Sequence, residues 1–360
     1  MSLVTANNLK QTIKTEAESL GFSHIGFCSI DPIQDFPIYL QWIEDGYAGD
    51  LHYLTREDAI HKRNNPKLIM DSAKSIISLA MPYPPHLKKT SETGNSSIAS
   101  YAWEKDYHLR IPSKLEILIN RIHDLIPDKP LEYRIYTDTG PLLERSIANQ
   151  TGLGWIGKNS CLLIPNVGSY FFLAEILINI EFLPDKPFNL DLCGTCTRCI
   201  KSCPTNCILP NRTLDATRCI SYLTIENRSG IDSELRESVG EWLFGCDICQ
   251  QVCPWNIRFA ETSSDFHFKL SPEIENLDPR TILGMEHDQF KKTFHENPLY
   301  RAKLRGLKRN AIVALGNAKR TEDLRILEET LTNETDKMLI ELLEWAICRL
   351  KAASLPDINA

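Results

Sequence analysis

The residues with the most recognisable chemistry are cysteines in the second half of the chain. The run from Cys193 to Pro204 has the spacing C-x2-C-x2-C-x3-C-P, which is typical of proteins that bind two 4Fe–4S clusters. Gaps of two residues let a tight loop direct three sulfurs at one cluster. The fourth cysteine stands before a proline that redirects the chain, so it is predicted to bind a second cluster.

A second cysteine run supplies the remaining ligands. The run from Cys246 to Pro254 reads C-x2-C-x3-C-P, one cysteine short of the full motif, and Cys219 is the obvious residue to complete it. In the bacterial ferredoxin pattern the last cysteine of a run binds the other run's cluster. The predicted ligand sets are Cys193, Cys196, Cys199 and Cys253 for one cluster, and Cys203, Cys219, Cys246 and Cys249 for the other.

Other uses of the cysteines fit less well. Disulfides are disfavoured because the sequence shows no secretory signal, and structural zinc does not need the repeated C-x3-C-P ending. Cys207 is close enough to Cys203 in the chain to compete as a cluster ligand. However, the exchange of the last cysteine between the two runs already gives each cluster four ligands. The remaining cysteines, Cys28, Cys161 and Cys348, stand in apolar surroundings and are predicted to be small core residues.

A glycine-rich segment, residues 152–159, resembles two kinds of nucleotide-binding loop by its letters alone. Asn159 stands where a phosphate-binding loop needs a Ser or Thr for magnesium. Residues 142–150 read as a helix where a dinucleotide-binding loop needs a strand. A nucleotide site is therefore disfavoured, and we interpret the segment as a loop that approaches another flat cofactor.

Asp138 follows a predicted strand over residues 133–136 and precedes a helix that begins near Pro141. In this position a carboxylate either caps the helix or faces a cleft at the end of the strand. Arg145, one or two helical turns further on, is placed to contact Asp138 or a ligand. The residues alone leave both roles of Asp138 open.

The composition is that of an ordinary globular protein. The 360 residues are 42% hydrophobic and 24% charged, and 40 basic against 47 acidic side chains give a net charge of −7. These values argue against a disordered or collagen-like chain. The longest nearly apolar stretch, residues 170–180, is shorter than the ~20 residues that a membrane-spanning helix needs. With no secretory signal visible, the protein is predicted to be cytoplasmic, with no membrane partner.

Basic side chains gather in one stretch near the C-terminus. Residues 301–320 hold seven Lys or Arg residues and no acidic one, which indicates either a local site for a polyanion or a solvated helix face. The segments 310–316 and 342–348 resemble each other, with Ala314 and Ala346 aligned 32 residues apart. This weak internal repeat indicates either stacked helical pairs of the HEAT type or an ordinary helical bundle.

Together these patterns predict an α+β protein of several domains. Residues 1–185 combine a helix from Leu9 to Leu20, ending at Gly21, with strands over 75–80 and 133–136. Residues 186–262 are predicted to form a two-cluster, bacterial ferredoxin-like domain. Residues 263–360 are predicted to be helical.

In order and spacing, these motifs resemble the epoxyqueuosine reductase family along residues 10–350. The resemblance implies a cobalamin-dependent iron–sulfur oxidoreductase that reduces epoxyqueuosine to queuosine at the wobble position of tRNA, with electrons passing through both clusters to cobalamin. A base in an anticodon loop is unstacked and can enter a pocket. The matching segments are 138–141, 144–145, 152–159 and the two cysteine runs, with 62–63, 105–108, 168–170 and 218–221 as further matches.

The resemblance also assigns regions and residues. Residues 1–185 would be an α/β cobalamin-binding catalytic domain, and residues 263–360 would be HEAT-like helices that bind tRNA. Asp138 would donate a proton to the substrate oxygen; a carboxylic acid does so near neutral pH only if burial or a neighbour raises its pKa. The implied corrinoid contacts are Arg63, Ala99, Asp138, Asn159, Leu162, Leu173 and Ser221, and the predicted tRNA contacts are Arg145, Arg305, Lys308 and Arg309.

Two alternative functions share part of this machinery. A reductive dehalogenase-like corrinoid enzyme would act on a small halogenated molecule, but the missing export signal and the basic stretch count against it. An electron-transfer ferredoxin would leave the long N-terminal region without a role. The expected partners are tRNA bearing epoxyqueuosine and an electron donor that the sequence does not identify. A monomer is expected because a tRNA-sized substrate needs free surface.

Overall fold

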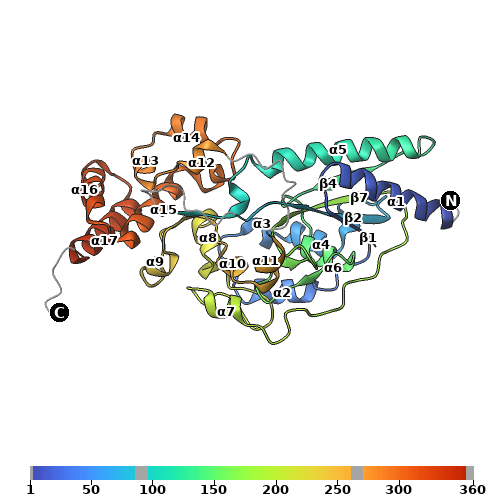
Figure 1. Cartoon of the computed structure of the whole chain (residues 1–360), viewed down its shortest axis with the longest axis horizontal. Helices are drawn as coiled ribbons and strands as arrows, with labels where there is room; N and C mark the ends of the chain where they lie inside the picture. Colours follow the sequence, from blue (N-terminus) through green and yellow to red (C-terminus); the bar gives the residue numbers. More distant parts are fainter. Residues whose placement is uncertain (1–2, 86–95, 261–270, 354–360) are drawn as a thin grey trace.

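The computed structural model describes residues 3–85, 96–260 and 271–353, with side chains from Asn8 onward (Figure 1). Its main sheet has the strand order β1 (His24–Ser29), β2 (Ser75–Pro82), β7 (Phe171–Ile178) and β4 (Tyr133–Tyr136), and all neighbouring strands are antiparallel. Strands β2 and β4 lie where the sequence predicts them. The mixture of helices and strands is confirmed. The α/β expectation for the first domain is wrong, because that class is built on parallel strands.

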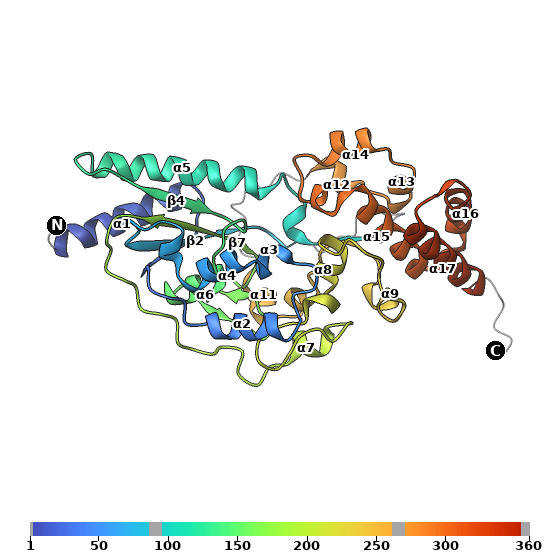
Figure 2. The same ribbon diagram turned by 180° about the vertical axis from the view of Figure 1, so that it is seen from behind.

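The two faces of the sheet bury different sets of side chains, because successive residues of a strand point in opposite directions. The even-numbered residues of β7 pack under α1 (Leu3–Ser19) and α5 (Tyr107–Leu125), which lie along one face in both views (Figures 1 and 2). The other face packs against α6 (Glu144–Gln150) and the hairpin of β5 (Trp155–Ile156) and β6 (Leu162–Leu163). Glu175 and Ser78, which are opposite each other in β7 and β2, belong to this second face.

Shorter elements complete the chain. β3 (Ser97–Ile98) pairs in parallel with β8 (Trp242–Phe244) and links the first region to the cysteine-rich one. Within the described ranges no helix is long and apolar enough to cross a membrane. The other α-helices are α2 (Phe36–Glu44), α3 (His52–Thr55), α4 (Glu57–Asn64), α7 (Arg198–Ser202), α8 (Ile220–Ile225), α9 (Ser233–Val239), α10 (Ile248–Gln251), α11 (Pro254–Phe259), α12 (Pro272–Glu275), α13 (Pro279–Leu283), α14 (His287–Phe294), α15 (Lys303–Ala318), α16 (Leu324–Asn333) and α17 (Lys337–Ala353).

The C-terminal helices share a core with the cysteine-rich region. Ile220, Leu223 and Phe244 are buried in the same cluster as the apolar side chains of α15 and α17. α15 and α17 approach so closely that a Cβ atom at Gly316 would lie 2.7 Å from the ring of Trp345. These helices occupy the end of the molecule opposite α1 (Figure 1). The predicted boundary at residues 262–263 lies outside the described residues.

Candidate functional site

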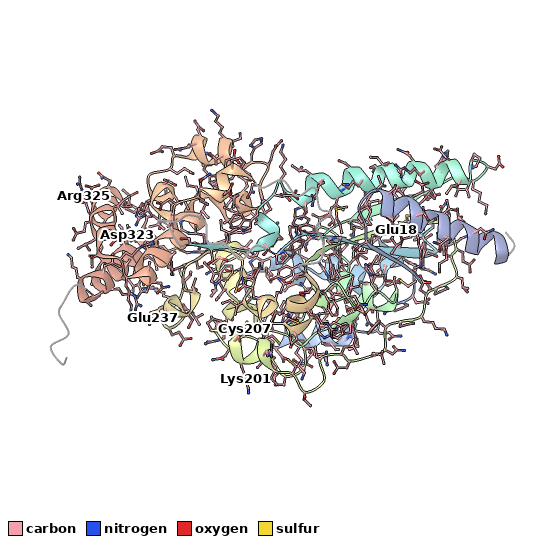
Figure 3. The ribbon with its side chains drawn as sticks, in the orientation of Figure 1. Glu18, Lys201, Cys207, Glu237, Asp323 and Arg325 are labelled. Atoms are coloured by element: carbon pink, nitrogen blue, oxygen red, sulfur yellow. The ribbon has the colours of Figure 1, made fainter. Side chains whose placement is uncertain are left out.

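The predicted cluster ligands lie in two groups. Burial raises the pKa of the Cys199 thiol, and the sulfurs of its own group add to that effect. Burial also raises the pKa of Cys246, again with sulfurs of its own group as neighbours. α7 packs against α10, and Figure 3 labels Cys207 and Lys201 within this part of the molecule. The first group contains Cys193, Cys196, Cys199 and Cys253, and the second contains Cys203, Cys219, Cys246 and Cys249.

Four thiols in each group suit a cluster better than a single ion. Among the described residues, no three His, Cys, Asp or Glu side chains converge closely enough to hold one metal ion. In a 4Fe–4S cluster each thiolate binds a different iron, so the four sulfurs surround the cluster instead of meeting at one point. A thiol binds iron as the thiolate, so cluster assembly must displace a proton from each of these cysteines.

The glycine-rich segment packs on the first cysteine loop. The Lys158 ammonium donates to the carbonyls of Gly194 at 2.7 Å and Cys196 at 3.0 Å, and the Trp155 indole nitrogen lies 3.4 Å from Cys193 Sγ. Donors of this kind beside thiolates favour the negative charge of a bound cluster. The segment contains β5 and continues through a turn to β6, and it does not open a helix, in agreement with the argument against a nucleotide loop.

The cysteines outside the two groups lie in different surroundings. Cys28 is buried, as predicted. Cys348 is exposed, and the prediction of a core position is wrong because this residue lies on the outward side of α17. Cys161 is only partly buried, and it and Cys207 lie beside the second group. Their hydrogen-bond partners are Cys249 for Cys161, and Cys203, with the sulfurs 3.4 Å apart, for Cys207.

Asp138 lies on the loop between β4 and α6, in a left-handed conformation with a φ of +57°. Its N–H donates to Glu144 Oε1 at 2.7 Å, and its carboxylate accepts from the Tyr107 hydroxyl at 2.7 Å. His108 Nε2 is 3.8 Å from the same carboxylate oxygen. α6 follows Leu143 without a side-chain cap, so the capping interpretation of Asp138 is wrong. Asp138 instead lines a cavity, with 67% of its side chain exposed.

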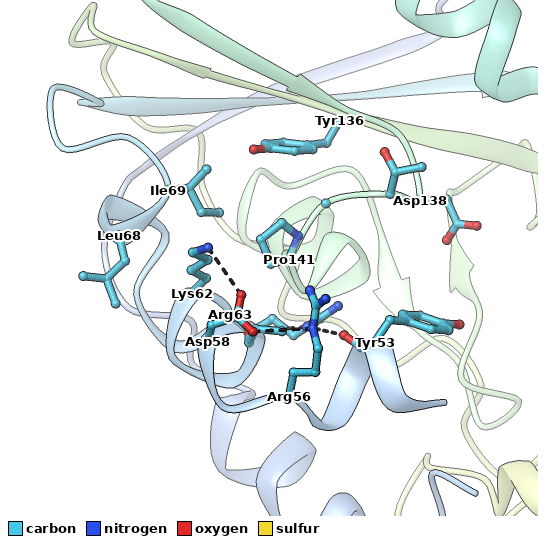
Figure 4. A pocket seen from close by; sticks show the side chains of 13 residues that line it. Tyr53, Arg56, Asp58, Lys62, Arg63, Leu68, Ile69, Tyr136, Asp138 and Pro141 are labelled. Atoms are coloured by element: carbon cyan, nitrogen blue, oxygen red, sulfur yellow. Dashed lines mark hydrogen bonds and ion pairs between the residues drawn. The ribbon is translucent and has the colours of Figure 1, made fainter. Parts of the chain in front are cut away.

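The cavity beside Asp138 has a volume of about 330 Å³. Its opposite wall carries three cationic side chains from α4 and the residue before it, Arg56, Lys62 and Arg63 (Figure 4). Arg63 is 4% exposed and is held by the carbonyl of Ala59 at 3.4 Å. Arg56 and Lys62 each lie 3.5 Å from a carboxylate oxygen of Asp58, which also lines the cavity, so this wall carries mixed charge.

Several of the other residues expected to contact a corrinoid lie near the second cysteine group, in space or in the chain. Asn159 and Leu162 flank Cys161, the hydrogen-bond partner of Cys249. A Cβ atom at Gly245, next to Cys246, would lie 2.5 Å from Ala99. Ser221 follows Cys219 by two residues on α8, and Leu173 lies on β7 two residues before Glu175.

Asn159 provides a test of whether a polar cofactor fits here. Its side chain is 5% exposed, and its amide Nδ2 has no hydrogen-bond partner among the described residues. A buried amide left unpaired costs free energy, which a ligand with an acceptor oxygen would recover. An acceptor oxygen at the polar rim of a cofactor such as cobalamin would satisfy this amide.

Sequence reasoning missed a pair of carboxyl groups next to Asp138. Glu175 is completely buried in β7, where it accepts from the Ser78 hydroxyl at 3.4 Å, and Glu144 on α6 is near enough to shift its pKa. Burial raises the pKa of Glu144 to about 8, and it raises the pKa of Glu175 well above its usual range. The available signal was one charged residue within the nearly apolar stretch 170–180.

Three of the predicted tRNA contacts reach the surface. Arg145 is exposed, and it donates to the Ser160 carbonyl at 3.0 Å and not to Asp138. Arg305, on α15, is half exposed and forms an ion pair with Asp336. Lys308, also on α15, is partly exposed.

Arg309 is buried, and the prediction that it contacts tRNA from the surface is wrong. Its side chain is 1% exposed and donates to the carbonyls of Asn227 at 2.7 Å, Ser229 at 2.8 Å and Leu223. Burial lowers the pKa of its guanidinium to about 10. The loop after α8 covers this side of α15, so Arg305 lies at the rim of the loop and Arg309 lies beneath it.

Two family models match separate parts of the chain. The model described as "4Fe-4S double cluster binding domain" matches residues 192–256, which include every predicted cluster ligand. The model described as "Epoxyqueuosine reductase QueG, DUF1730" matches residues 63–139, which run from Arg63 past Asp138.

Similarity to known proteins extends over almost the whole chain. The sequence is 36% identical to epoxyqueuosine reductase of Aliivibrio fischeri over 96% of this chain and 92% of that protein, and 38% identical to that of Cellulophaga algicola over 83% and 95%. The structure of epoxyqueuosine reductase from Streptococcus thermophilus has a TM-score of 0.86 at 31% identity, covering 98% of this chain and 92% of that one. A crystal structure of epoxyqueuosine reductase with an epoxyqueuosine-modified tRNA-Tyr stem loop has a TM-score of 0.80 at 30% identity, covering 96% and 100%. The chain belongs to the epoxyqueuosine reductase family.

Proposed function

We propose that this protein reduces epoxyqueuosine to queuosine at the wobble position of tRNA. The observation that carries the proposal is the match along 96% of the chain to a curated epoxyqueuosine reductase. Removal of the epoxide oxygen as water consumes two electrons and two protons. The chain must therefore provide an electron path, a proton donor and a surface for RNA, and the structure offers candidate residues for each.

Electrons would pass through two 4Fe–4S clusters held by the two crossed cysteine sets. The second group lies beside Asn159, Leu162 and Ala99, which is where we propose that cobalamin binds. Bound cobalamin would supply a low-potential cobalt centre for the reductive step. The unpaired side-chain amide of Asn159 would donate a hydrogen bond to the polar rim of the cofactor. The proposed holding residues are Arg63, Ala99, Asp138, Asn159, Leu162, Leu173 and Ser221.

Asp138 would donate the proton that the substrate oxygen accepts. Tyr107 and His108 fix the direction of its carboxyl group at the edge of the cavity. The other ring nitrogen of His108 is 2.6 Å from Asp106, which orients the ring. A histidine held in this way can return a proton to Asp138 after each turnover.

RNA would approach across the mouth of the cavity and along α15. Arg145, Arg305 and Lys308 are the proposed phosphate contacts, since all three are at least partly exposed. We assign residues 1–185 to catalysis and cobalamin binding, 186–262 to the clusters, and 263–360 to HEAT-like helices that bind tRNA. The protein would act in the cytoplasm as a monomer, and a separate protein would supply its electrons.

Assay on tRNA tests the proposal. Anaerobically reconstituted protein with cobalamin and a chemical reductant should convert epoxyqueuosine in tRNA taken from cells that lack this activity, with the nucleosides measured by mass spectrometry. Protein carrying Asp138→Asn serves as the matched control. If the wild-type protein holds both clusters and cobalamin but leaves epoxyqueuosine unchanged, the proposal is wrong.

A further inference from the structure

The loop that holds the first cysteine group lies at the surface. Gly194 and Thr195, between Cys193 and Cys196, are exposed. A Cβ atom at Gly194 would have no described atom within 4 Å apart from its chain neighbours. On the protein side of the loop, the Trp155 indole nitrogen lies 3.4 Å from Cys193 Sγ. A single turn of chain therefore separates this group from solvent.

The second cysteine group lies against the proposed cobalamin site. The Ser100 N–H donates to Asp247 Oδ2 at 2.7 Å, and a Cβ atom at Gly245 would lie 2.5 Å from Ala99. These contacts place the chain after β3 against the turn that contains Cys246, where we propose that cobalamin binds. If cobalamin takes electrons from the second group, the first group is the one that remains to accept electrons from a donor.

Two segments that are distant in the chain meet beside this loop. The Trp255 indole N–H donates to the carbonyl of Leu192 at 3.2 Å, which joins the start of α11 to the chain just before Cys193. Two residues from these partners, Leu190 and Ile257 are 63% and 57% exposed. Large apolar side chains that remain exposed beside a redox centre suit the small, weakly bound interface of an electron-transfer complex.

Cations surround these apolar side chains. We call the surface formed by residues 186–203 and 253–260 the loop face, and Arg198, Lys201 and Arg258 are exposed on it. Arg198 and Lys201 form no ion pair within the described residues. α7, which carries both, lies at the lower edge of the molecule in both views (Figures 1 and 2), and Lys201 is labelled at that edge in Figure 3.

Acidic side chains are few on the loop face. Asp191 is the one acidic residue in its two segments, and it forms an ion pair with Arg212 at 2.6 Å. Asp185, which directly precedes the first segment, is held 2.8 Å from Lys10. The loop face therefore carries a local positive charge in a protein whose net charge is −7. Such a face attracts an anionic partner and speeds its encounter.

We propose that the loop face binds the electron donor, and that this donor is an acidic protein that carries single electrons. The reduced donor gives one electron to the first cluster and leaves oxidised, so two encounters supply the two electrons of each epoxide reduction. Steering charges around a small apolar centre allow the rapid binding and release that successive encounters require. The inference rests on the proposed function, which needs an outside source of electrons, and it identifies the surface and the chemistry of that source.

Reversal of the charge on α7 tests the steering. The probe is fully reduced flavodoxin, an acidic protein whose blue semiquinone forms as it gives one electron to the anaerobic, cluster-loaded protein. At low salt, Arg198→Glu combined with Lys201→Glu should slow this transfer by about tenfold or more, and the rate should depend less on salt than in wild type. The matched control is Lys291→Glu combined with Lys292→Glu, two exposed lysines of α14 at the opposite edge of the molecule (Figure 1).

Two results would contradict the steering. Either transfer to the wild-type protein that does not slow as salt is raised, or equal rates in wild type and the α7 variant, would overturn the proposal. An iron content of about eight per chain, with equal reduction by excess dithionite, shows that the clusters compared are intact.

Binding measured without electron transfer tests the apolar centre. Calorimetry with oxidised flavodoxin should give Ile257→Ala a Kd severalfold higher than wild type at every salt concentration, because the substitution removes apolar contact area and no charge. Since the Ile257 side chain is mostly exposed, its truncation leaves the fold intact. An unchanged Kd would show that the donor does not cover this part of the loop face and would overturn the proposal.

These measurements need neither tRNA nor cobalamin, so they separate the inference from the proposed function. Salt-dependent reduction through the loop face, in a protein that leaves epoxyqueuosine unchanged, would support the donor surface and remove the proposed reaction. Conversion of epoxyqueuosine with a chemical reductant, together with equal transfer from flavodoxin in wild type and the α7 variant, would keep the reaction and overturn the inference.

Discussion

The cluster cysteines and the acids around Asp138 reach their positions by different routes. Most of the cysteines come from two short runs, so their spacing in the chain already determines which of them meet. The acids come from the loop after β4, from α6 and from the middle of β7, and they meet only because these elements pack together. Local spacing specifies the first site, and tertiary packing specifies the second.

The two sites should also respond differently to substitution. A cysteine that leaves a cluster removes the covalent ligand of one iron, and that cluster becomes prone to lose iron. A carboxyl group that leaves the Asp138 site removes one or two hydrogen bonds, each worth about 0.5–1.5 kcal/mol or somewhat more when charged. Loss should therefore be abrupt at the cysteines and graded at the acids.

The largest effect is expected at Cys253. If the crossed assignment is correct, Cys253→Ala destroys the cluster held by Cys193, Cys196 and Cys199, and the iron content falls from about eight to about four per chain. Iron analysis and electron paramagnetic resonance of anaerobically reconstituted protein measure this. Cys348→Ala, at an exposed cysteine outside both groups, is the control. Loss of the cluster held by Cys246 and Cys249 instead would show that the runs do not cross.

A smaller, graded effect is expected at Asp138. Asp138→Asn keeps the shape of the side chain and removes its proton, so kcat should fall by about 10²- to 10⁴-fold, the usual worth of a general acid. Clusters and cobalamin should stay bound, as their absorption spectra would report. A variant that loses cobalamin yet keeps a normal kcat when saturated with it would show that Asp138 serves binding alone.

Because Arg309 is buried, its substitution should lower the stability of the protein and leave its affinity for RNA unchanged. Arg309→Met leaves the carbonyls of Asn227, Ser229 and Leu223 without a donor, and should cost at least about 2 kcal/mol of unfolding free energy. The control is Arg325→Met, at an arginine whose side chain is 88% exposed. Thermal unfolding of the anaerobic protein compares them. Equal midpoints would mean that the Arg309 network contributes little.

The smallest effect is expected at the surface of α15. Replacing Arg305 and Lys308 together by Gln should raise the KM for tRNA severalfold with little change in kcat, because phosphate contacts form before and during chemistry alike. The dependence of log kcat/KM on log salt should flatten by about one for each phosphate group that the variant no longer binds. Identical salt slopes in variant and wild type would identify this part of the basic stretch as a solvated face.

What the sequence predicts correctly depends on short-range patterns. β2, β4 and the end of α1 before Gly21 follow from periodicity and a glycine, and the two groups of cysteines follow from spacing. Asp138 lines a cavity, which is one of the two roles that its place after a strand left open. In each case the determining residues are neighbours in the chain.

The features that escaped prediction depend on contacts between distant segments. Antiparallel pairing of β2 with β7 joins residues about 100 positions apart, and nothing local in either strand sets its direction. From the sequence, Arg309 is predicted to be a surface cation, but in the structure the loop after α8 covers it. Glu144 reads as an ordinary first-turn acid until Glu175 packs against it. The type of a charged residue therefore does not determine whether its side chain is buried; the packing of distant segments does.

The common core of residues 220–350 has a consequence for how this architecture can evolve. Apolar side chains of α15 and α17 are buried with those of α8 and β8, and Asn310 donates to the carbonyls of Thr224 and Leu243. A recombination event that replaced the C-terminal helices would expose that core and break those bonds. The helices therefore cannot be exchanged as an independent module, and this end of the molecule must diverge by substitutions that keep the shared core.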